Sequence, residues 1–161
     1  MNKLRILPFL ALLFMIVAPL TASAHITEAC TPGFYKNHPQ FITGNSCFTI
    51  DQNTLVSSLY PGVDPCVGNL SLLGVLSAPT KACGSPNGLP GGEIILLRQA
   101  VTRMLNATNS NPNACSEANA IISVTNKAIA EAVADDDRQI LIDQAERFGA
   151  RNNDQPCTIG Q

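Results

Sequence analysis

The chain has 161 residues, with 10 basic and 12 acidic side chains, a formal net charge of −2, six cysteines and no tryptophan. This length favours one domain over a multidomain enzyme, and the slight negative charge argues against the basic face that nucleic-acid binding requires. Because 45% of the residues are hydrophobic and only 14% are charged, the chain can form a core, and its composition is not that of a disordered protein.

Residues 1–24 have the features of a secretory signal peptide. Lys3 and Arg5 form a short basic region, an apolar run follows from Ile6 to Leu20, and Ala22-Ser23-Ala24 provides small residues at the cleavage site. The run is too short to span a membrane comfortably, and no later stretch is long and apolar enough to do so. We therefore predict that residues 25–161 form a single secreted or periplasmic domain, without a transmembrane segment after cleavage.

The cysteines predict that disulfides stabilise this domain. All six lie after the predicted cleavage site: Cys30, Cys47, Cys66, Cys83, Cys115 and Cys157. An even number of cysteines in an exported chain is typical of a disulfide framework, because the compartment beyond the membrane is oxidising. The sequence does not choose among the possible pairings. The wide spacings, with no Cys-x-x-Cys, disfavour structural zinc and thioredoxin-like redox chemistry.

The first unusual segment of the mature chain is residues 29–41, Ala-Cys-Thr-Pro-Gly-Phe-Tyr-Lys-Asn-His-Pro-Gln-Phe. Pro32-Gly33 predicts a turn, and Pro39 restricts the preceding residue to an extended backbone. Aromatic residues concentrated in this way form either a small local core or a contact surface for a glycan or a peptide. The candidate contact loop consists of Phe34, Tyr35, Lys36, Asn37, His38 and Phe41.

Residues 25–92 are rich in glycine, proline, asparagine and serine, and we expect long loops there with few regular elements. Ser46–Ile50 is predicted to be a short extended piece. Two short helices are predicted, Asp51–Leu59 and Ser71–Ser77, and each ends shortly before a proline that cannot continue it.

Apolar residues at helical spacing predict three longer helices after residue 92. The first runs from Glu93 to Asn106, with Glu93 at its positive N-terminal end, and the second from Ser116 to Ala134. The third begins in the run of aspartates at 135–137, which we interpret as helix-capping residues, not as a calcium site, and stops at Gly149. The predicted fold is mostly α: a small disulfide-stapled helical domain with long N-terminal loops.

Two motifs resemble a signature of secreted bacterial proteins. The run Pro32-Gly33-Phe34-Tyr35 followed by Lys-Asn-His is similar to their Pro-Gly-aromatic-aromatic-Lys-Asn-His motif, although Tyr35 stands where tryptophan is commoner. Downstream, Leu96-Leu97-Arg98-Gln99-Ala100 through Leu105-Asn106-Ala107 is similar to their second motif, and the resemblance covers about residues 30–107. It implies an exported domain of no established activity, and it carries over no catalytic or binding residue.

Two alternative functions depend on the only two histidines, His25 and His38. Cleavage after Ala24 would make His25 the N-terminal residue, whose amine and imidazole could bind copper together with His38, a geometry that Cu(II) accepts. The other alternative is an unrecognised hydrolase, for which His38 would be the base. The sequence has no Gly-x-Ser-x-Gly motif for such an enzyme.

The sequence favours a non-catalytic binding or structural protein of the bacterial cell surface or extracellular space, with no cofactor. The acidic residues that could serve a two-carboxylate glycosidase are scattered along the chain: Glu28, Asp51, Asp64 and Glu93. The sequence does not identify the partner. The candidates are a glycan or a protein of the cell envelope or the extracellular space, and a nucleic acid is not expected.

Overall fold

The computed structural model describes residues 30–43, 47–110 and 114–154. Over these ranges the chain forms six α-helices, two short 3-10 helices and a single isolated bridge between Leu55 and Ser71, which confirms the mostly α fold with long N-terminal loops. None of the helices in these ranges is long and apolar enough to cross a membrane. The predicted signal peptide lies outside the described residues.

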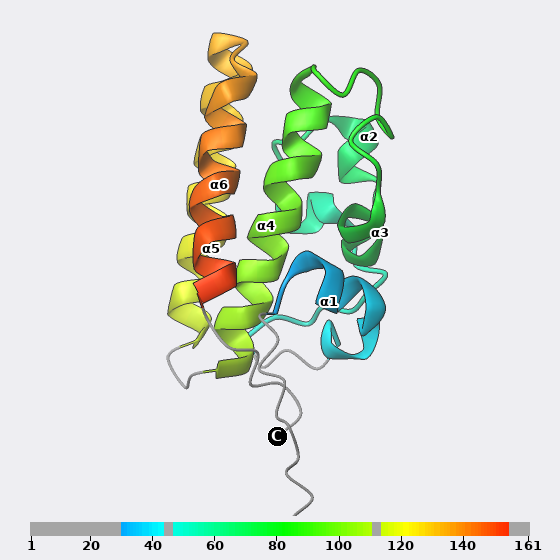
Figure 1. The fold of residues 1–161 in the computed structure, drawn as a ribbon, viewed down its shortest axis with the longest axis vertical. Coiled ribbons are helices and arrows are strands. Elements are labelled where there is room, and N and C mark those ends of the chain that lie inside the picture. The colour runs from blue at the N-terminus through cyan, green and yellow to red at the C-terminus, as the bar shows by residue number, and fades with distance from the viewer. Residues whose placement is uncertain (1–29, 44–46, 111–113, 155–161) are drawn as a thin grey trace, which may run out of the picture.

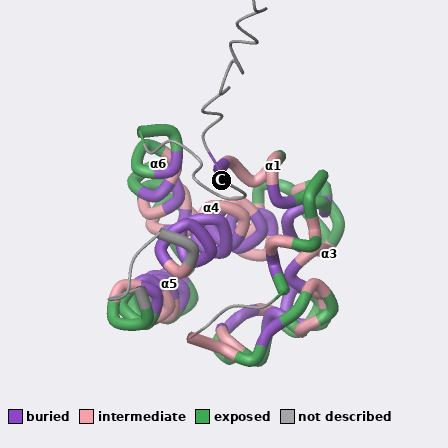
Figure 2. Tube along the Cα trace, turned by 90° about the horizontal axis from the view of Figure 1, so that it is seen from below, coloured by how far each residue is buried: buried purple, intermediate pink, exposed green. Residues whose placement is uncertain are grey.

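Helix α4, Leu89–Ser110, is the central element of the domain. Figure 2 shows it buried between α5 and α6 on one side and the N-terminal elements on the other. Its fully buried residues include Ile94, Leu96, Leu97, Ala100, Val101, Met104 and Leu105. The apolar stripe predicted for residues 93–106 is confirmed, but the helix is longer at both ends.

The first turn of α4 contains Gly91 and Gly92, which allow the helix backbone to lie close to Pro86 and Leu141. A Cβ atom at Gly91 would lie 2.4 Å from the carbonyl oxygen of Pro86, and one at Gly92 would lie 2.9 Å from Leu141 Cδ1. Pro90 fits the first turn of a helix, where its missing N–H is not needed. Residues that usually interrupt a helix therefore begin this one.

Helices α5, Ala114–Asp135, and α6, Arg138–Asp154, both pack against α4 (Figure 1). The side chain of Asp137 accepts a hydrogen bond from the backbone N–H of Gln139 at 2.8 Å, which confirms the predicted capping role of the aspartate run. The predicted stop at Gly149 is wrong. The helix continues to Asp154, and its last turns bury Phe148 and Asn152.

The opposite side of α4 carries the short elements of the N-terminal half. They are α1, Pro32–Asn37; the 3-10 helices Pro39–Phe41 and Val56–Ser58; α2, Pro65–Gly68; and α3, Leu72–Ser77. Helix α3 is close to the predicted helix Ser71–Ser77. The Ser71 side chain caps it by accepting a hydrogen bond from the Gly74 N–H at 2.9 Å.

Three local predictions in this half are wrong or only partly tested. Residues 32–33 begin a helix, not an isolated turn, because Thr31 caps it and proline suits the first helical position. The predicted helix 51–59 is reduced to its 3-10 turn, since Val56 N–H donates to the carbonyl of Leu70 and Leu72 N–H to that of Thr54, both at 2.9 Å. No strand forms at 47–50, and Ser46 lies outside the described residues.

Disulfides join segments that are far apart in the chain. Cys47 bonds to Cys115 across 68 positions, and Cys66 bonds to Cys83 across 17 positions. Cys30 is also disulfide-bonded. Cys157 lies outside the described residues. The predicted disulfide stapling is therefore confirmed for the five cysteines that the structure describes.

Candidate functional site

The candidate contact loop forms α1 and the 3-10 turn that follows it, and three of its rings pack together. The ring of Phe34 lies 4.7 Å from that of His38 and 5.7 Å from that of Phe41 between centroids, and the two phenylalanine rings are stacked. His38 and Phe41 are 6.2 Å apart. We call these three residues the ring cluster. Phe34 and Phe41 are half-buried and His38 is exposed.

The remaining residues of the loop divide between the surface and the core. Lys36 and Asn37 are exposed beside the ring cluster. Tyr35 points the other way: it is completely buried, and its hydroxyl donates a hydrogen bond to Asn106 Oδ1 of α4 at 2.9 Å. The exposed or half-buried residues of this loop are therefore Phe34, Lys36, Asn37, His38 and Phe41, whereas Tyr35 attaches the loop to the core.

Asn106 is the centre of a buried hydrogen-bond network that the sequence did not reveal. Its side-chain amide donates to the carbonyl oxygen of Cys30 at 3.0 Å and to Asn152 Oδ1 at 3.3 Å. Asn152 in turn donates to the backbone carbonyl of Gln99 at 3.1 Å and to its side-chain oxygen at 3.0 Å. The network fastens the start of the described chain and the end of α6 to the central helix.

The two motifs of the sequence signature meet in this network. Tyr35 belongs to the first motif, and Gln99 and Asn106 belong to the second. Arg98 of the second motif also holds a neighbouring element, because its Nε donates to the Val75 carbonyl of α3 at 3.4 Å. Tyr35 of the first motif and Arg98, Gln99 and Asn106 of the second thus hold neighbouring elements together by hydrogen bonds, whereas Lys36, Asn37 and His38 of the first motif are exposed. The only sequence signal for this was an asparagine within the apolar pattern of α4.

Two of the scattered acidic residues come together at the other end of α4. Glu93 is only 1% exposed, and its Oε2 accepts a hydrogen bond from the backbone N–H of Asp64 at 2.9 Å. The Asp64 side chain caps α2 by accepting from the Cys66 N–H. Burial, reinforced by the nearby Asp64 carboxylate, raises the pKa of Glu93 to about 7, although the hydrogen bond from Asp64 opposes the rise.

This shift predicts a pH-dependent stability. The folded chain holds the Glu93 proton more tightly than the unfolded chain, whose pKa is near 4.5, so the contribution of Glu93 to stability is greatest below pH 4.5 and falls as the pH rises to about 7. The fall is at most about 3 kcal/mol. Glu93→Gln mimics the protonated acid and is expected to raise the free energy of unfolding by roughly 1–3 kcal/mol at about pH 8, and to change it little at about pH 4.5.

Urea unfolding of the wild type and of Glu93→Gln at both pH values measures this difference. Glu146→Gln, which changes an exposed acid of α6, is the control and is expected to leave the pH dependence unchanged. If Glu93→Gln and the wild type lose equal stability between the two pH values, Glu93 does not titrate as described.

Of the two histidines on which the copper and hydrolase hypotheses depend, the structure describes only His38. His25 lies outside the described residues, so the copper hypothesis stays a prediction. Across residues 30–43, 47–110 and 114–154, no group of three or more His, Cys, Asp and Glu side chains could hold a metal ion. The His38 ring packs against the rings of Phe34 and Phe41.

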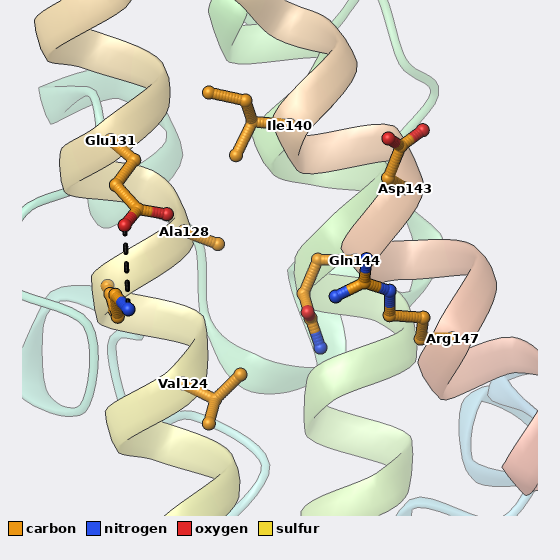
Figure 3. A pocket seen from close by; sticks show the side chains of 8 residues that line it. Val124, Ala128, Glu131, Ile140, Asp143, Gln144 and Arg147 are labelled. Atoms are coloured by element: carbon orange, nitrogen blue, oxygen red, sulfur yellow. Dashed lines mark ion pairs between the residues drawn. The ribbon is translucent and has the colours of Figure 1, made fainter.

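A separate groove follows the outer side of the three long helices, between α5 and α6 (Figure 3). A cavity of about 370 Å³ is lined by Val124, Lys127, Ala128, Glu131, Ile140, Asp143, Gln144 and Arg147. A second cavity of about 320 Å³ shares Val124, Gln144 and Arg147 with it and continues towards the ion pair of Arg103 with Glu117. The groove has no signal in the sequence, because its residues become neighbours only when α5 and α6 pack side by side.

Comparisons with protein-family models, with curated proteins and with solved structures find no match to this chain.

Proposed function

We propose that this chain is exported and acts as a non-catalytic, disulfide-stabilised binding or structural protein of the bacterial cell surface or extracellular space. The predicted signal peptide at residues 1–24 and the resemblance to secreted proteins support export. The disulfides support it independently, because such bonds persist mainly in oxidising compartments.

The ring cluster of Phe34, His38 and Phe41 is the observation that carries the proposed contact surface. Its rings are partly exposed, yet they pack on one another, and Phe34 lies on helix α1, which Tyr35 attaches to the core. A surface that is already rigid loses little conformational entropy when a partner binds. Aromatic rings offer large apolar faces to sugars and to peptide side chains, so the proposed partner is a glycan or a protein of the envelope or the extracellular space.

Replacing Phe34 and Phe41 together by alanine tests this surface. Washed cell envelopes of the native host are the probe, and co-sedimentation of the processed protein measures binding. The double variant is expected to bind roughly 10- to 100-fold more weakly, because truncation of two aromatic contacts typically costs a few kcal/mol of binding free energy. Protease-treated envelopes and purified peptidoglycan sacculi separate a glycan partner from a protein partner.

Val133→Ala is the matched control, since Val133 is 54% exposed on α5 and distant in sequence from the ring cluster. His38→Ala changes an exposed ring with little consequence for the core, so it tests the surface even if the double variant is destabilised. Wild-type protein that does not sediment with any of these probes, or ring-cluster variants that are folded and bind as the wild type does, would contradict the proposal.

A further inference from the structure

The charged residues that line the first cavity of the α5–α6 groove change sign along the helix axes. Glu131 on α5 and Asp143 on α6 lie towards the turn that joins the two helices (Figure 3). One helical turn further from it lie the basic residues Lys127 and Arg147. Lys127 and Glu131 pair within α5 at 3.6 Å, but their side chains remain 75% and 52% exposed. The groove therefore presents an acidic pair and a basic pair, one above the other.

Apolar side chains also line the groove, at and on either side of the level of these pairs. Ile140 lies nearer the joining turn than Asp143, Ala128 lies between the two pairs, and Val124, which is 44% exposed, lies beyond the basic pair. Both helices bury their inner faces against α4. Their outer faces thus leave a strip of apolar surface flanked by charges, which is the composition of an interface between helices.

The charge pattern distinguishes between possible occupants. A partner of uniform charge would be attracted by one pair and repelled by the other. A second copy of the chain carries the same two pairs, so a two-fold axis in the interface plane and perpendicular to the helices would place the acidic pair of each copy opposite the basic pair of the other. An axis parallel to the helices would instead oppose like charges, which is unfavourable.

We propose that the α5–α6 groove is the interface of a symmetric homodimer, in which α5 and α6 of two copies pack antiparallel as a four-helix arrangement. Isologous two-fold interfaces of this kind are the commonest among homo-oligomers. Helix α6 has 17 residues and is about 25 Å long. Two copies of this two-helix face would bury on the order of 1,000 Å², the lower limit for a specific interface. Interfaces of this size are found among weak and transient complexes, so we expect a dissociation constant on the order of micromolar or weaker.

Complementary charge reversals test this interface. Sedimentation equilibrium of the processed protein at low ionic strength is expected to show a monomer–dimer equilibrium. Glu131→Lys with Asp143→Lys makes both pairs basic, and Lys127→Glu with Arg147→Glu makes both pairs acidic. Each double variant alone is expected to dimerise at least about tenfold more weakly than the wild type. An equimolar mixture of the two is expected to form heterodimers with about wild-type affinity.

Glu146→Lys reverses a charge on α6 that lines the cavity between α4 and α6, and it is expected to leave dimerisation unchanged. A wild-type chain that remains monomeric at about 500 µM overturns the proposal, and it would leave the groove to a partner of different sequence or to a small ligand. Heterodimers that fail to form, or dimers that withstand both reversals, also overturn it. None of the substitutions changes the ring cluster of Phe34, His38 and Phe41, so failure of the dimer and failure of the proposed contact surface are observed separately.

Discussion

Replacing Cys47 and Cys115 by serine is expected to lower the free energy of unfolding by about 4 kcal/mol. The bond links residues 68 positions apart, so it removes chain entropy from a large part of the unfolded state. The bond between Cys66 and Cys83 links residues 17 positions apart. Its replacement by two serines is expected to cost about 3 kcal/mol, because the shorter loop has less entropy to lose. Equilibrium unfolding in urea of both double variants measures the difference.

The position of the longer disulfide adds a structural reason for its larger effect. Cys47 follows the ring-cluster segment, whereas Cys115 lies in the first turn of α5. The bond therefore fastens the N-terminal half to a helix on the other side of α4. Replacement of the exposed Ser77 and Ser123 by alanine is the control, and it is expected to change stability little. Equal losses for the two disulfides, or a larger loss for the shorter one, would refute the entropic explanation.

The long helices could be predicted from the sequence because their stability comes from a continuous apolar face. The stripe of α4 is regular over several turns, and in the structure its residues are fully buried. Helix α3 was predictable for a local reason, since Ser71 provides a cap in front of a leucine-rich run. In both cases the local pattern and the tertiary packing favour the same structure.

The predicted boundaries of α4 and α6 are wrong at glycines, because tertiary contacts decide whether a glycine ends a helix or lies within it. Gly149 looks like the end of α6, but the helix passes it, and the nearest atoms to a Cβ there would be those of the Gln99 side chain. Gly91 and Gly92 look like a loop before α4, but they allow α4 to lie against Pro86 and Leu141. Glycine permits both a chain reversal and a close approach of backbone, and only the neighbour shows which of the two applies.

The sequence predicted the composition of the candidate contact loop, but not which of its side chains face the core. The aromatic residues near the N-terminus could be grouped by position alone, and Phe34, His38 and Phe41 do form one cluster. Position alone could not show that Tyr35 faces the core, because its partner Asn106 is 71 positions away. The charge pattern of the α5–α6 groove was hidden in the same way, since neither helix alone shows it.

Asn106→Ala is therefore expected to be among the most destabilising substitutions in the chain, lowering the free energy of unfolding by roughly 3–5 kcal/mol. The change removes the acceptor for the Tyr35 hydroxyl and the donor to the carbonyl of Cys30 and to Asn152. Each of these groups is then buried without the hydrogen bond that it makes to Asn106, and such losses are costly in a low-dielectric interior. Thermal and urea unfolding measure the effect.

A graded series of variants separates the network from simple loss of volume. Tyr35→Phe removes one hydrogen bond and keeps the ring, so it is expected to cost only about 1–2 kcal/mol. Asn153→Ala alters an exposed neighbour of Asn152 and is expected to be nearly neutral. If Tyr35→Phe and Asn106→Ala were equally mild, α1 would not depend on this network, and the ring cluster would lack the rigid support on which its proposed role as a contact surface rests.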